Sequence, residues 1–161
     1  MIVLRCTQRL AKRSKLQLDL DPPPSTGILG DWYANVLNIG SQRLVLCLSE
    51  RSLLPVILPA RKQEFPRRFG YYLREVLTAL QVPPASVAAE VEESQEARFA
   101  RTANKSLVGA LNDFIYHAQV YIDRGETVLE ATLHLTEMPS KPIGYDSPDR
   151  ITTTLFRAAR A

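Results

Sequence analysis

The sequence predicts an α+β fold, with a mostly antiparallel sheet of four to five strands packed by helices on one side. Two observations lead to this prediction. Three strand-like runs, DWYANVLNI, QRLVLCLS and LLPVILP, follow one another between residues 31 and 59 with only short turns between them. Residues 106–124 then carry apolar side chains at the i, i+3, i+4, i+7 spacing of an amphipathic helix. The chain of 161 residues suits a single globular domain, 1–161.

The start of the chain predicts a strand, a short basic helix and a loop. Residues 2–7, IVLRCT, are mostly β-branched or apolar, which is typical of a strand. The next segment, QRLAKRSKLQL, fits a short helix that carries several cations. DPPPSTG must be a loop, because three consecutive prolines fit neither a helix nor a central strand.

The three strand-like runs predict an antiparallel meander. Gly40-Ser41 suits a tight hairpin turn between the first two strands. The run LVLCL is apolar without alternation, so we expect it to be a central strand covered on both faces. Pro55 places the third strand at an edge of the sheet or at a bulge.

Helices dominate the second half of the predicted fold. We expect a helix from about Pro66 to residue 80, a short acidic helix over 85–96, and a last strand over 98–102. The long helix follows, capped by Asn104 or Ser106 and ended by Gly125. Gly109 within it would permit close approach of a strand or another helix. We favour helices again for residues 127–138 and from Ser147-Pro148 onward.

Composition limits the class of protein. No apolar run approaches the roughly 20 residues that span a bilayer, and the beginning of the chain lacks the pattern of a secretory signal. We therefore expect a cytoplasmic protein with no membrane segment. Cys6 and Cys47 lie in strand-like runs and are interpreted as buried thiols. Phosphate-loop motifs and paired His or Cys spacings are absent, so no cofactor and no metal are expected.

Charge is divided unevenly along the chain. Residues 1–74 carry 12 Lys and Arg against 5 Asp and Glu, whereas residues 75–161 carry 8 against 12. Phosphate binding needs positive charge at suitable density rather than a particular motif. Tyr71 and Tyr72 could in addition stack on exposed bases. An unevenly charged, solvated surface without a partner is the alternative. The candidate binding residues are Arg9, Lys12, Arg13, Lys15, Arg61, Lys62, Arg67, Arg68, Arg101 and Lys105.

The long helix also carries a possible acid–base pair. Asp113 and His117 are four residues apart, a spacing at which a carboxylate could orient an imidazole. Asn112, Asn104 and Arg101 could assist them. The pair lacks a nucleophile of its own, and a structural or surface pair is the alternative.

Several blocks together resemble a family of small bacterial proteins of unknown function. They are IVLRCTQRL, LGDWYANVL, RLVLCLSERSLLPVILPA, RTANKSLVGALNDF and SPDRITTTLF, so the resemblance covers nearly the whole chain. In the family the Asn-Asp pair is expected to follow a methionine, where this chain has Leu111, a substitution that a core tolerates. The resemblance implies no activity. Its motif positions are Asp31, Trp32, Asn35, Asn104, Gly109, Asn112 and Asp113.

The two most distinctive blocks are interpreted as two halves of one structural junction. We expect Asp113 to be buried and to accept backbone N–H groups from the loop around residues 31–35. Trp32 is interpreted as a core residue, with a binding platform as the alternative.

Two functions follow from these observations. The first is a non-catalytic module that binds nucleic acid or an acidic protein through its basic N-terminal half, in a mobile-element or defence setting. The second is an enzyme that acts on nucleic acid or nucleotides through Asp113 and His117.

Overall fold

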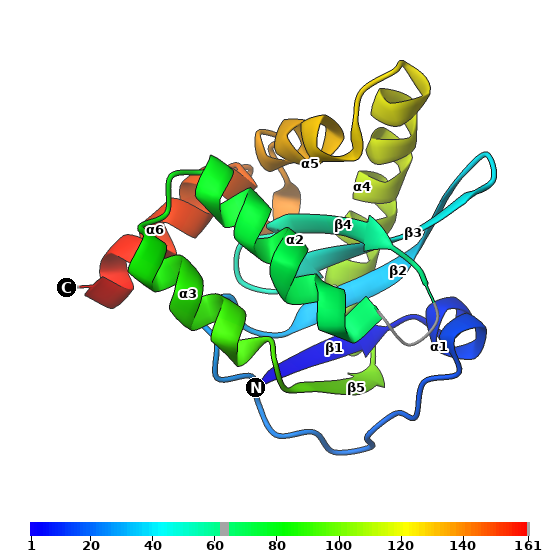
Figure 1. The fold of residues 1–161 in the computed structure, drawn as a ribbon, viewed down its shortest axis with the longest axis horizontal. Helices are drawn as coiled ribbons and strands as arrows, with labels where there is room; N and C mark the ends of the chain where they lie inside the picture. Colours follow the sequence, from blue (N-terminus) through cyan, green and yellow to red (C-terminus); the bar gives the residue numbers. More distant parts are fainter. Residues whose placement is uncertain (62–64, 161) are drawn as a thin grey trace.

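A five-stranded sheet in the order β4-β3-β2-β1-β5 forms the centre of the computed structural model, which describes residues 1–61 and 65–160 apart from the side chains of residues 65 and 66 (Figure 1). The strands are β1 (Ile2–Cys6), β2 (Trp32–Ile39), β3 (Gln42–Ser49), β4 (Pro55–Pro59) and β5 (Ala97–Arg101). β2, β3 and β4 form the predicted antiparallel meander. β1 pairs in parallel with β2 on one side and β5 on the other.

The pairing directions bring four strand ends to one edge of the sheet. β3 runs antiparallel to β2 and β4, so β4 has the same direction as β2, and β1 and β5 share that direction. The carboxyl ends of β1, β2, β4 and β5 therefore lie at the same edge, which we call the carboxyl edge. The α+β class and the mainly antiparallel pairing are confirmed, and the parallel addition of β1 and β5 completes the sheet.

Helices cover both faces of the sheet, which corrects the prediction that they pack on one side. The helices α1 (Gln8–Ser14), α2 (Phe65–Ala79), α3 (Pro84–Glu93) and α6 (Pro148–Arg160) bury residues in a first core on one face. The helices α4 (Lys105–Asp123) and α5 (Val128–Thr136) pack on the other face (Figure 1). A single turn of 3₁₀ helix, η1 (Lys141–Ile143), lies between α5 and α6.

The sheet has a hydrophobic core on each face, because successive side chains of the central strands point to opposite faces and both sets are buried. In β3, Val45 and Cys47 belong to the first core, and the residues between and beside them belong to the second. In β2, Trp32 lies in the first core, with its ring 4.9 Å from that of Phe69, whereas Tyr33 faces the second. Trp32 is fully buried, so it is a core residue and not a binding platform.

The edge strand β4 is protected by its prolines. Backbone bonds from Ser49 N–H to Leu54 C=O and from Ala60 N–H to Arg43 C=O set the alternation of hydrogen bonds between β3 and β4. Residues 55, 57 and 59 consequently turn their backbone groups away from β3. Two of these three residues are prolines and have no N–H to offer, which limits pairing with another strand.

Local signals correctly predicted the remaining elements. The side chain of Asn104 caps α4, and Gly125 follows it with φ 97°, in the left-handed region. α5 begins with a capping box between Thr127 and Glu130. Gly40, with φ 56°, lies in the two-residue turn between β2 and β3. In the described part of the chain, no helix is both long and apolar enough to cross a membrane.

Phe114 should be essential to the second core, where its side chain is fully buried. We expect Phe114→Ala to lower the free energy of unfolding by about 3–5 kcal/mol, because a buried ring is lost and a cavity is left. Urea denaturation monitored by circular dichroism measures this change. Tyr116→Ala is the matched control, since this ring is 63% exposed on the same helix. Equal stability of the two variants would contradict the assignment of the buried face.

Candidate functional site

Polar residues of the motif blocks meet at the carboxyl edge. Thr7, which caps α1, donates a hydrogen bond from its hydroxyl to Asn35 Oδ1 over 2.6 Å. Asn35 Nδ2 in turn donates to Asn112 Oδ1 of α4 over 3.2 Å. These two bonds connect the helices on opposite faces of the sheet through β2. The predicted junction between the two motif blocks therefore exists, and Asn35 and Asn112 form it.

Asp31 has a separate structural role. Its carboxylate is almost buried and accepts hydrogen bonds from Arg5 Nε and from the Ser25 hydroxyl, both over 2.7 Å. Arg5 also donates to the backbone carbonyl of Arg101 over 3.1 Å. Asp31 thereby fixes the proline-rich loop and the start of β2 to the paired strands β1 and β5.

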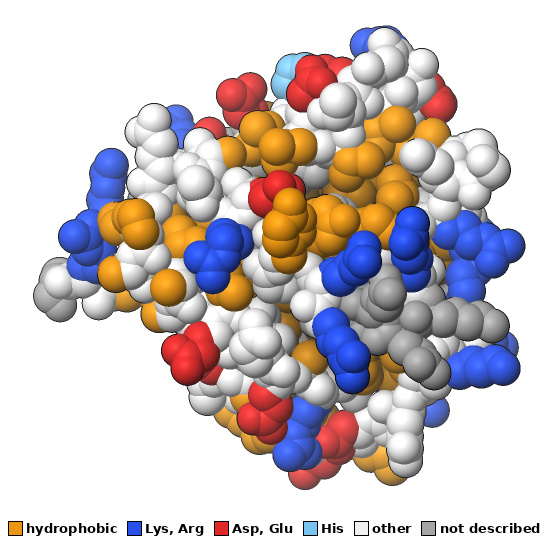
Figure 2. All heavy atoms as spheres, in the orientation of Figure 1, with side chains coloured by type: hydrophobic (Ala, Val, Ile, Leu, Met, Phe, Trp, Pro, Cys, Tyr) orange, Lys and Arg blue, Asp and Glu red, His pale blue; other side chains and the backbone are white. Residues whose placement is uncertain are grey.

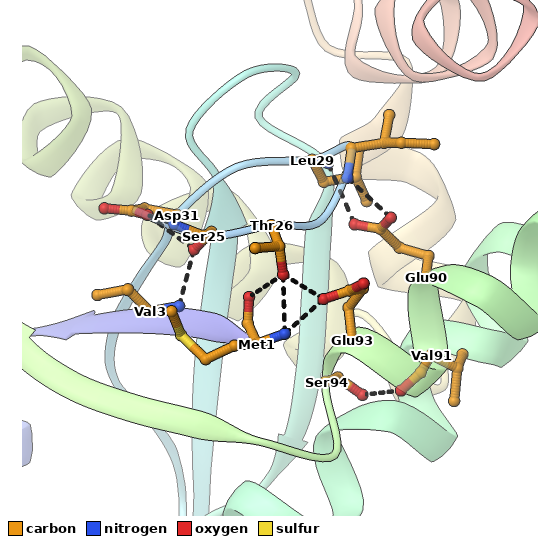
Figure 3. Close-up of polar contacts among 11 residues, drawn as sticks. Met1, Val3, Ser25, Thr26, Leu29, Asp31, Glu90, Val91, Glu93 and Ser94 are labelled. Atoms are coloured by element: carbon orange, nitrogen blue, oxygen red, sulfur yellow. Dashed lines mark hydrogen bonds and ion pairs between the residues drawn. The ribbon is translucent and has the colours of Figure 1, made fainter. Parts of the chain in front are cut away.

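A second group of polar contacts attaches the same loop to α3 (Figure 3). The Glu90 carboxylate accepts the backbone N–H groups of Ile28 and Leu29 over 2.9 and 3.1 Å. A Cβ on Gly27 would lie 2.6 Å from Glu90 Oε1, so a larger residue at this point would have to displace the Glu90 carboxylate. The amino group of Met1 bonds to the Thr26 hydroxyl over 2.9 Å and forms an ion pair with Glu93. These contacts were not predicted, because each joins residues distant in the sequence.

The prediction that Asp113 is buried is wrong. Its side chain is 60% exposed, and its Oδ1 lies 3.7 Å from His117 Nδ1. The imidazole instead uses Nδ1 to donate to the backbone carbonyl of Asp113 over 2.9 Å. The buried residues of α4 fall on one side, and each residue turns the helix by about 100°, so Asn112 is directed toward β2 and Asp113 toward solvent.

The other residues proposed to assist Asp113 and His117 have separate roles. Asn104 Oδ1 accepts the backbone N–H groups of Ser106 and Leu107, and Asn112 is bonded to Asn35. Burial raises the pKa of Cys6 to about 12 and that of Cys47 well above its ordinary value, so both thiols stay protonated. In the described part of the chain, no group of three His, Cys, Asp or Glu side chains could hold a metal ion.

We predicted that Gly109 lets a strand or another helix of the same chain come close to the long helix, and the described part of the structure shows no such neighbour. A Cβ at this position would meet no atom within 4 Å. Other glycines do lie against neighbouring side chains: a Cβ added to Gly70 would lie 2.7 Å from Ser94 Oγ, and one added to Gly30 would lie 3.1 Å from Arg51 Cγ. Gly109 is thus an exposed helix residue, and nothing in this fold explains why the position is glycine.

The candidate binding residues follow the carboxyl ends of β1, β4 and β5. α1 comes directly after β1 and carries Arg9, Lys12 and Arg13, and Lys15 caps its end. Arg61 follows β4, and Arg67 and Arg68 lie in the first turn of α2. Arg101 ends β5, where strand alternation places it on the face of the first core together with Phe99. Lys105 begins α4 on the opposite layer, and Lys62 lies outside the described residues.

Arg43 was missed by the sequence analysis. It is the second residue of β3, and β3 begins where β2 ends, so Arg43 also lies at the carboxyl edge. Its side chain is exposed. Figure 2 shows Lys and Arg side chains spread over α2 and toward the end of the molecule that carries α1.

Two aromatic residues extend from α2 beside these cations. Tyr71 is 60% exposed, and its ring meets that of Tyr72 edge to face at 5.2 Å. A hydrogen bond to Glu75 raises the pKa of Tyr71 and holds its hydroxyl. Arg67 and Arg74 lie four residues before and three residues after Tyr71, so the three side chains share one side of the helix.

Comparison with known protein families identifies a match over most of the chain. A family model described as a domain of unknown function, DUF6933, matches residues 3–151. A search of the curated proteins finds no match.

Asp31 and Asp113 should respond differently to the same substitution. Asp31→Asn removes the charge opposite Arg5 in a nearly buried site, and we expect a loss of about 1–3 kcal/mol in the free energy of unfolding. Asp113→Asn, at an exposed position, should change it by less than about 0.5 kcal/mol. Thermal and urea unfolding of the two variants side by side measures both values. A larger loss for Asp113→Asn would contradict the junction described above.

Glu90 should give a pH-dependent contribution to stability. Burial raises its pKa, although the two backbone N–H groups oppose the shift. The folded protein therefore binds this proton more tightly than the unfolded chain does. The resulting stability is present below the unfolded pKa of about 4.3 and is lost as the pH rises through the folded pKa.

Glu90→Gln provides the measurement, because glutamine does not titrate. The free energy of unfolding of the parent minus that of the variant should fall as the pH rises from about 4 toward neutral. Urea unfolding at a series of pH values gives this difference directly. A difference that rises over the same range would show that the carboxylate is favoured in the folded state.

Proposed function

The chain belongs to the DUF6933 family of domains of unknown function, and we propose that it binds single-stranded nucleic acid without catalysis. The binding site is a basic surface at the carboxyl edge, made of α1, the start of β3 and the start of α2. Its described cations are Arg9, Lys12, Arg13, Lys15, Arg43, Arg61, Arg67 and Arg68.

The arrangement of cations from separate segments supports the proposal most strongly. Because β1, β2 and β4 run in the same direction and β3 runs opposite, β1 and β4 end at the edge where β3 begins. The cations that follow are almost all exposed. Among the described residues, no ion pair neutralises Lys12, Arg43 or Arg67. Exposed cations at this density suit a polyanion, whose binding releases condensed counterions.

The exposed ring of Tyr71 favours a single strand over a duplex. Unstacked bases can lie on an aromatic face, and such stacking typically contributes about 1–3 kcal/mol for each base. Arg67 and Arg74 flank the ring on the same side of α2, where they can contact the phosphates on either side of a stacked base. An acidic protein could use the same cations and could also pack on the ring, but its binding would not depend on unpaired bases.

Anisotropy of a fluorescein-labelled single-stranded oligonucleotide tests the proposal. We expect binding that weakens steeply between about 50 and 200 mM salt. Replacing Arg9, Lys12, Arg43 and Arg67 by alanine should lower the slope of log K against log salt by about 3, since each phosphate contact on a single strand contributes about 0.7. Tyr71→Leu should weaken binding to the single strand and leave this slope unchanged.

A matched control removes the same charge elsewhere. Arg124, Lys141, Arg157 and Arg160 are exposed and lie outside the basic surface, so their replacement by alanine also lowers the net charge by four. This variant should retain most of the affinity. If both quadruple variants lose affinity equally, binding depends on net charge alone and the site is wrong. If the parent does not bind nucleic acid at low salt, the proposed function is wrong.

A further inference from the structure

The outer face of α4 carries three exposed residues that take no part in its buried side. Lys105, Gly109 and Asp113 are spaced four residues apart, so they form one ridge along the helix. All three are exposed, and Tyr116 beside them is 63% exposed. The buried residues of α4 lie on the other side of the helix, against the sheet.

Gly109 has no role in packing within the chain. Its φ is not in the left-handed region that would require glycine, and a Cβ would meet open space. Apart from proline, glycine is the least favourable residue in a helix interior. A glycine at such a position allows the backbone of another helix to come unusually close, which an exposed residue can do only with a separate molecule.

The charges on either side of Gly109 indicate that the approaching helix belongs to a second copy of this chain. Lys105 precedes Gly109 by four residues and Asp113 follows it by four, so each lies about 6 Å from it along the helix axis. If two copies of α4 cross in opposite directions at Gly109, Lys105 of each copy lies opposite Asp113 of the other. A two-fold axis through the crossing makes both ion pairs at once.

We propose that two copies of this chain associate through α4, with Gly109 at the crossing and two reciprocal Lys105–Asp113 ion pairs. Residues at i±4 form the ridges that interlock in the commonest class of helix pairs. Both charges are available, because among the described residues Lys105 forms no ion pair and Asp113 pairs with His117 alone, at 3.7 Å. The bond between Asn35 and Asn112 on the flank of α4 holds the ridge in position.

This surface is separate from the proposed nucleic-acid site. α4 packs on the face of the sheet opposite α1 and α2 (Figure 1). A single crossing of two helices buries less area than an obligate dimer does, so the association should be reversible and dependent on concentration.

Sedimentation velocity of the full chain from about 1 µM to about 1 mM tests the proposal. The parent should shift from monomer to dimer across this range. Lys105→Asp places two acids opposite each other at both contacts, and Asp113→Lys places two cations there, so each should weaken dimerisation at least about tenfold. The double variant, Lys105→Asp with Asp113→Lys, restores opposite charges and should return the dissociation constant to within about threefold of the parent.

Two further variants separate dimerisation from folding. Gly109→Gln should raise the melting temperature of the monomer, because glutamine favours helix and its Cβ meets open space, and should nevertheless weaken the dimer. Asp123→Lys is the charge control, since Asp123 is exposed on α4 but lies beyond the crossing; it should dimerise as the parent does.

Three results would overturn the proposal. The first is a parent that remains monomeric over the whole concentration range. The second is a dimer that Gly109→Gln and the single charge reversals leave unchanged. In the third, the single reversals weaken the dimer and the double reversal fails to restore it, which would exclude the pairing of Lys105 with Asp113.

Discussion

The parallel pairing of β1 with both β2 and β5 is the constraint on which the rest of the structure depends. β1 is buried and joins the antiparallel meander to a strand some 90 residues later in the chain. Parallel neighbours need long connections: β1 leads to β2 through α1 and the proline-rich loop, and β5 follows only after the meander, α2 and α3. The contacts of Asp31 with Arg5 and of Glu90 with Ile28 and Leu29 fix that loop in place. The same pairing brings the starts of α1 and α4 to one edge.

Local elements and the antiparallel meander could be predicted from the sequence, whereas the parallel pairing of β1 with β2 and β5 could not. Helical periodicity and the capping residues correctly indicated α2, α4 and α5, because those signals lie within a few residues of each other. The neighbour of β1 depends on residues far away, so the strand predicted over 98–102 could not be assigned to β1 from local signals. The uninterrupted apolar run of β3 already implied cover on both faces, and this conflicts with helices on one side only. The apolar run predicted the arrangement of helices correctly, because uninterrupted apolar residues are typical of a strand buried on both faces.

The candidate site shows the same limit at the scale of single residues. Asn112 and Asp113 differ by one residue, yet the rotation of the helix directs one to Asn35 and the other to solvent. A sequence pattern defines the buried side of a helix and leaves the residues on its flanks undecided. Likewise, three glycines look alike in the sequence, but Gly27 and Gly70 lie against side chains and Gly109 does not. The proposed polyanion site depends less on such detail, because phosphate binding needs positive charge at suitable density rather than a particular side-chain direction.

The central claim is that cations from α1, β3 and α2 act together because four strand ends share one edge. Amide hydrogen exchange with and without a single-stranded oligonucleotide tests it most directly. The account predicts slower exchange on binding in residues 8–15, 40–43 and 67–74, with no change in 128–136 or 148–160. Protection confined to residues 128–160, with none in α1 or α2, would contradict it.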